Sequence, residues 1–112
     1  MNQELVIEQK TIGDMTVLRP TGDIDMARSS AIRKVVTEVI RARPAKLVID
    51  LSAVEYMDSS GIATMIEALQ SSMRNKIKFA LVGVGPRVKV AFEITKLLGM
   101  FQIYDTVEDA GK

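Results

Sequence analysis

The chain has 112 residues, 47% of them hydrophobic and 26% charged, with 15 basic residues against 14 acidic ones. This length suits one domain with one core, and the composition is that of a globular chain rather than a disordered one. Because the sequence holds no histidine and no cysteine, it excludes a Ser-His-Asp triad, a thiolate nucleophile, disulfides and zinc sites of the usual Cys/His type.

The charges are interleaved along the chain and form no basic block, so we expect no nucleic-acid partner and no docking on an anionic membrane. No apolar run approaches the ~18 residues of a membrane span, which predicts no membrane insertion. The first residues show no basic and apolar leader pattern. A cytoplasmic location is therefore the expectation.

The first elements are a hairpin and a helix. Two β-type runs, about 4–11 and 15–20, flank Gly13-Asp14 and predict an antiparallel hairpin. From Ala27 the apolar period changes to that of a helix, which Pro44 stops. The predicted buried stripe of this helix is Ile32, Val35, Val36, Val39 and Ile40.

The second half of the chain alternates strands and helices. Continuous apolar runs at 46–51 and 77–84 predict strands covered on both faces. The helix between them ends at Asn75-Lys76, and its predicted stripe is Ile62, Met65, Ile66, Leu69 and Met73. A third helix is predicted to start at Gly85-Pro86, to be capped by Gly99, and to bury Val90, Ala91, Ile94, Leu97 and Leu98.

A short strand at 101–105 and a final turn complete the order ββαβαβαβ, with one further short helix at most. Each amphipathic helix must bury its stripe against the sheet, so the fold class is a single-domain α/β structure with a mixed sheet.

The segment "DSSG", Asp58 to Gly61, lies between the third strand and its helix and holds more polar groups than a helix start needs. A single N-cap side chain satisfies one of the unpaired backbone N–H groups of a helix start, and no Glu or Gln follows at the spacing of a capping box. Glycine in a first helical turn costs up to about 1 kcal/mol, which indicates close approach of another segment. A plain cap and a displayed hydroxyl both remain open interpretations.

A displayed serine could act as a nucleophile or accept a phosphate. The chain supplies no histidine base, no G-x-S-x-G elbow and no S-x-x-K pair, so a serine hydrolase is disfavoured. A phosphate acceptor needs no base from this chain, and the positive end of a helix favours the added charge.

Asp23 and Asp25 occupy the loop before the first helix, which we expect at the same end of the sheet as "DSSG". Two carboxylates there could bind Mg²⁺, but capping of the first helix by Asp25 is the preferred interpretation. The segment 83–89 matches neither phosphate-loop pattern, so Arg87 and Lys89 are interpreted as a solvated helix start. We predict no cofactor and no metal.

The strand "LVIDLSAVEYM" running into "DSSGIATMIEAL", together with "TGDID" before it and "FALVGVGPRVKVAFEITKLLGMFQIYD" after it, resembles a STAS domain of the bacterial anti-sigma factor antagonist type. The similarity covers about residues 4–108, which we take as the domain.

The resemblance implies regulation by partner switching. The unphosphorylated antagonist would bind an anti-sigma factor that is also a serine kinase of the GHKL ATPase type, and so release a sigma factor. Phosphorylation would abolish this binding, and a PP2C-type phosphatase would restore it.

The resemblance also assigns roles to the candidate residues. It makes Ser59 the phosphate acceptor rather than Ser60 and puts Asp25 near it, while Asp23 stands where the family commonly has Glu. Ser60 is then the expected helix cap, Asp58 shapes the site's anionic environment, and Gly61 allows close approach. The alternative is a STAS regulatory subunit of a lipid or anion transport system, with no phosphate cycle.

Overall fold

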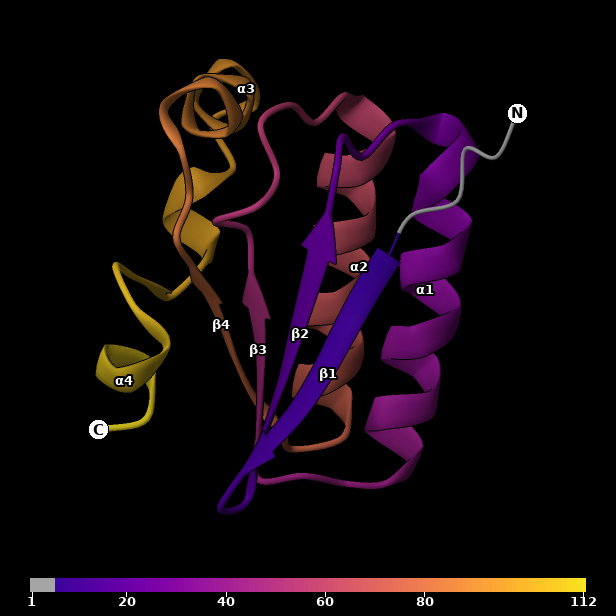
Figure 1. Ribbon diagram of the computed structural model, residues 1–112, viewed down its shortest axis with the longest axis vertical. Coiled ribbons are helices and arrows are strands. Elements are labelled where there is room, and N and C mark those ends of the chain that lie inside the picture. Colours follow the sequence, from indigo (N-terminus) through magenta and orange to yellow (C-terminus); the bar gives the residue numbers. More distant parts are fainter. Residues whose placement is uncertain (1–5) are drawn as a thin grey trace.

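The computed structural model describes residues 6–112, which form one sheet with helices packed on its two faces (Figure 1). The elements in chain order are β1 (Val6–Ile12), β2 (Met15–Thr21), α1 (Met26–Arg41), β3 (Lys46–Asp50), α2 (Ser59–Arg74), β4 (Lys78–Val82), α3 (Pro86–Thr95), a 3₁₀ helix (Leu98–Met100), β5 (Ile103–Tyr104) and α4 (Val107–Ala110). This confirms the predicted order and the mixed α/β class. Residues 4 and 5 of the predicted hairpin and domain lie outside the described residues.

The sheet has the strand order β1-β2-β3-β4-β5. β1 is antiparallel to β2, as the Gly13-Asp14 turn predicted, and the other neighbours are parallel. Because the carboxyl ends of parallel strands meet at one edge, the loops that follow β2, β3 and β4 open at the same end of the molecule.

The two faces of the sheet are covered unequally. The larger core joins α1, α2 and α3 to one face, and it includes an edge-to-face contact of the Phe92 and Phe101 rings at 5.3 Å between centroids. On the opposite face, α4 is the only helix of the described chain, and it covers a smaller cluster: Met15, Val17, Val48, Ala80, Val82 and Ala110. Among residues 6–112, none covers the part of this face that lies over β1 and β2 (Figure 1).

The predicted buried stripe of α3 is confirmed for Ala91, Leu97 and Leu98, which pack partly buried against the core, and is wrong for Val90 and Ile94. The residues that this helix buries are Val88 and Phe92, whereas Val90 and Ile94 are 52% and 76% exposed. Both pairs have the i, i+4 spacing of a helical stripe, so the apolar pattern is compatible with two rotations of the helix about its axis, each of which buries a different pair. The structure therefore leaves an apolar strip on the solvent side of α3.

The predicted C-terminal cap of α3 is also wrong. The helix ends at Thr95 because Lys96 adopts the left-handed conformation, with φ of 61°. Gly99 lies beyond it, in the 3₁₀ helix.

Candidate functional site

Two loops at the carboxyl end of the sheet are joined by backbone hydrogen bonds. The N–H of Ile24 donates to the carbonyl of Tyr56 at 3.0 Å, and the N–H of Asp58 donates to the carbonyl of Ile24 at 3.1 Å. These bonds make an isolated parallel bridge between Ile24 and Met57. The predicted placement of the "TGDID" and "DSSG" loops at the same end of the sheet is confirmed, and the bridge between them fixes where α1 and α2 begin.

Asp58, and not Ser60, is the N-cap of α2. Its Oδ1 accepts hydrogen bonds from the backbone N–H groups of Ser60 at 2.9 Å and Gly61 at 3.2 Å. The prediction that Ser60 caps the helix is therefore wrong. The bridge at Met57 delivers Asp58 to the cap position, so both serines fall inside the first turn.

The hydroxyl of Ser60 has a partner. It donates to Oδ1 of Asp58 at 2.5 Å, and Ser60 is partly buried. This hydroxyl is the main cause that lowers the pKa of Asp58 below its ordinary value of 3.8; burial opposes it, and backbone N–H groups of Gly61, Ser60 and Met26 add to the lowering. Asp58 is therefore a fixed negative charge at neutral pH.

Ser59 differs from its neighbour in exposure and in bonding. It is the first residue of α2 and is exposed, and no hydrogen bond found within residues 6–112 involves its hydroxyl. A hydroxyl in this state is accessible to a modifying enzyme and loses no internal bond when it is modified.

Gly61 makes the close approach that the sequence predicted. A Cβ atom there would lie 2.3 Å from Cγ of Met57 and 2.9 Å from Cγ2 of Ile24, and both of these side chains are fully buried. The first turn of α2 thus contacts the bridge that joins the two loops.

Asp25 caps α1, as preferred from the sequence. Its Oδ1 accepts from the N–H of Arg28 at 3.0 Å, and its Oδ2 pairs with the Arg28 guanidinium at 2.7 Å. Asp23 lies exposed in the same loop. Across residues 6–112 the acidic side chains form no group of three or more that could hold a metal ion.

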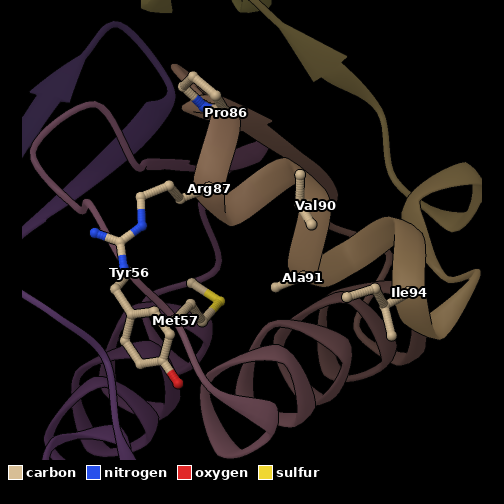
Figure 2. A pocket seen from close by; sticks show the side chains of 7 residues that line it. All are labelled: Tyr56, Met57, Pro86, Arg87, Val90, Ala91 and Ile94. Carbon is tan, nitrogen blue, oxygen red and sulfur yellow. The ribbon is translucent and has the colours of Figure 1, made fainter.

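An apolar groove borders this site. It has a volume of about 480 Å³ and lies between the loop before α2 and the exposed strip of α3 (Figure 2). The guanidinium of Arg87 extends toward Tyr56, 5.7 Å from the centre of its ring, in cation–π range. The lining residues are Tyr56, Met57, Pro86, Arg87, Val90, Ala91 and Ile94.

The sequence did not reveal this groove, because Val90 and Ile94 were assigned to the core and Arg87 to solvent. The available signal was the second apolar stripe of α3. Of the exposed methionines, Met26 lies at the start of α1 beside the site and is 79% exposed, whereas Met73 and Met100 lie elsewhere.

The fold and site together define a small α/β domain that displays, at the start of a helix, a serine whose hydroxyl has no hydrogen bond within the described chain, beside an ionised carboxylate. The chain belongs to the STAS domain family, whose sequence model matches residues 6–110. Within the described residues, no helix has the length and apolar character needed to cross a membrane.

The relatives carry regulatory names. The chain is 31% identical over 96 residues to the anti-sigma-F factor antagonist RsfB of Mycobacterium tuberculosis, covering 86% of this chain and 78% of RsfB. The crystal structure of an anti-sigma factor antagonist from Mycobacterium paratuberculosis superposes with a TM-score of 0.83 at 28% identity, covering 95% and 90% of the two chains. That of the Thermotoga maritima protein TM1081 gives 0.87 at 25% identity, covering 94% and 91%.

Proposed function

We propose that this protein is an anti-sigma factor antagonist that works in the cytoplasm by partner switching. In its unphosphorylated form it binds an anti-sigma factor that is also a serine kinase of the GHKL type, and so releases a sigma factor. Phosphorylation of Ser59 abolishes this binding, and a PP2C-type phosphatase reverses it. The names of the relatives support the antagonist role, and the contrast between the two serines supports the switch.

The state of the two hydroxyls is the observation that carries the proposal. Ser60 donates its proton to Asp58 and would lose this bond on modification, whereas Ser59 is exposed and has no such bond in the described chain. The geometry thus favours the same serine as the family resemblance, and on independent grounds.

The charge of the site explains why a phosphate would reverse binding. Asp58 is already ionised, so a phosphate of about −1.5 to −2 on the next residue makes the start of α2 strongly anionic. A partner surface that contacts a hydroxyl there would have to accommodate this charge, and desolvation and like-charge repulsion at an interface cost several kcal/mol. A loss of this size reverses a binding preference.

The fold would tolerate the same phosphate. Ser59 lies at the positive end of a 16-residue helix, where negative charge is favourable, and its side chain is exposed. We therefore expect phosphorylation to change the binding surface and to leave the domain folded.

The groove beside Ser59 would supply the apolar part of the interface. Val90 and Ile94 are exposed there, and Met57 joins the groove to the start of α2. A partner seated over Ser59 could bury this strip at the same time, so one phosphate would act on an interface that apolar contacts hold together.

The test uses the unmodified chain and its Ser59→Ala, Ser60→Ala and Ser59→Asp variants. Each is incubated with ATP and the GHKL kinases of the source genome, and phosphate is mapped by mass spectrometry. We expect phosphate on Ser59 in the wild type and in Ser60→Ala, and none in Ser59→Ala. Ser59→Asp should fold normally and bind the same kinase at least tenfold more weakly.

Two outcomes would overturn the proposal: no kinase modifies Ser59, or Ser59→Asp binds its partner as tightly as the wild type. Co-purification of a membrane transporter in place of a kinase would instead support the transport-subunit alternative.

A further inference from the structure

The strand β1 is the outer strand of the sheet on the side of the hairpin (Figure 1). It pairs with β2, and within residues 6–112 no other strand pairs with it. It is exposed over most of its length, and its terminal apolar residues Val6 and Ile12 are 61% and 46% exposed. A seven-residue edge of this kind is a template for another strand unless something blocks it.

The backbone groups that β1 offers can be assigned from its pairing. Ile12 and Met15 flank the two-residue turn and form a hydrogen-bonded pair, and such pairs alternate along an antiparallel ladder. Ile7 then falls opposite Pro20 in a non-bonded pair, which suits a proline because it has no N–H. The N–H and C=O groups that point away from β2 therefore belong to Ile7, Gln9 and Thr11.

The side chains of β1 are self-complementary about Gln9. When a second copy runs antiparallel with Gln9 opposite Gln9, Glu8 stands opposite Lys10 twice and Val6 stands opposite Ile12 twice. Ile7 stands opposite Thr11 on the other face. Opposite charges and apolar pairs at such positions each stabilise a ladder by about 0.2–1 kcal/mol.

No other symmetric register has this property. The twofold axis of such a dimer is perpendicular to the sheet, so residues that stand opposite each other lie on the same face. The register can therefore shift only in ways that keep even-numbered residues of β1 opposite even-numbered ones. The neighbouring choices place Glu8 opposite Glu8 or Lys10 opposite Lys10, and they leave the ends of the strands unpaired. Like charges directly opposite one another are destabilising.

Glu8 remains available for such a pair. Its contact with Arg19 in the same chain is 3.8 Å long, with the two side chains 63% and 45% exposed, and an ion pair of this kind contributes little. No contact of Lys10 with another charged side chain occurs in residues 6–112.

We propose that the β1 strands of two copies of this chain pair antiparallel about Gln9, so that two five-stranded sheets form one continuous sheet in a symmetric dimer. The three outward residues of each strand each offer one N–H and one C=O, and in this register all of them find a partner. The edge is separated from β3 and α2 by β2, so the dimer carries two Ser59 sites.

The test measures dimerisation of the full chain by sedimentation velocity from low micromolar to near-millimolar protein. Charge reversal gives paired variants: Lys10→Glu puts Glu opposite Glu twice, and Glu8→Lys puts Lys opposite Lys twice. We expect a concentration-dependent dimer for the wild type and at least a tenfold weaker one for each variant alone. Lys89→Glu, an exposed reversal on α3 at the β4 side of the sheet, should dimerise like the wild type (Figure 1).

The decisive arm mixes the two variants in equal amounts. At positions 8 and 10 the Lys10→Glu chain then carries only glutamate and the Glu8→Lys chain only lysine, so every charged pair across the interface is attractive. Native mass spectrometry should find the mixed dimer in clear excess over either homodimer, while circular dichroism and melting confirm that each variant is folded. A wild type that stays monomeric throughout, single variants that dimerise like the wild type, or a mixture that stays monomeric would each overturn the proposal.

Discussion

Replacing Gly61 by alanine tests whether the start of α2 depends on close contact with the bridge between the loops. In an open helix this substitution stabilises by about 1 kcal/mol, because glycine is the poorer helix former. Here the new Cβ would lie 2.3 Å from Cγ of Met57 and 2.9 Å from Cγ2 of Ile24. Both side chains are at most 1% exposed, so they have little room to move aside.

Overpacking of a filled core typically costs about 1–3 kcal/mol, and contacts this short fall at or beyond the upper end. After subtraction of the helix gain, we expect Gly61→Ala to lower the free energy of unfolding by about 2 kcal/mol. This corresponds to a fall in melting temperature of roughly 6–12 °C for a domain of this size. Urea titration followed by circular dichroism measures the first quantity, and a thermal scan measures the second.

Gly99→Ala is the matched control, because a Cβ at Gly99 would meet no heavy atom within 4 Å. It should change stability by less than about 0.5 kcal/mol. If Gly61→Ala proved as stable as the wild type, the contact with Ile24 and Met57 would not constrain this turn.

Three further predictions concern the cap, the core and the groove. The pKa of Asp58 is lower in the folded protein than its ordinary value of 3.8, so the ionised carboxylate stabilises the fold fully above that pH and progressively less below it. The difference in unfolding free energy between the wild type and Asp58→Asn should therefore become smaller as the pH falls below 3.8. Ser72→Ala should raise stability by about 1 kcal/mol in urea titrations, since the Ser72 hydroxyl is buried and has no hydrogen-bond partner in residues 6–112; Ser71→Ala, at a partly exposed residue, should raise it less. Val90→Glu and Ile94→Glu should leave the melting temperature unchanged but weaken capture of the proposed kinase at least tenfold, whereas equal capture would exclude the groove from the interface.

The order of the elements could be predicted from the sequence because each break carries its own chemistry. Gly13-Asp14 can form only a tight turn between two β-type runs, and Gly85-Pro86 starts a helix without a side-chain cap. The phase of α3 could not be predicted in this way. Val88 and Phe92 have the same spacing as Val90 and Ile94, and only the direction in which the chain leaves β4 decides which pair meets the core.

At the candidate site, too, the sequence predicts some features and not others. Asp58, Ser59 and Ser60 are all good capping residues, so local preference did not identify the cap. The choice depends on the hydrogen bond from the N–H of Asp58 to the carbonyl of Ile24, a residue distant in sequence, and no local pattern indicates this bond. The role of Gly61 was easier to predict, because a glycine that weakens a helix start indicates a steric reason.

The bridge between Ile24 and Met57 also makes the site observable from a distance. The amide protons of Ile24 and Asp58 are both held in backbone hydrogen bonds between the two loops, so their exchange with solvent reports whether the loops are joined. In a nuclear magnetic resonance spectrum these two amides would act as built-in probes, one on each loop. A change made only at Ser59 would then be detected at Ile24, at the start of the other helix.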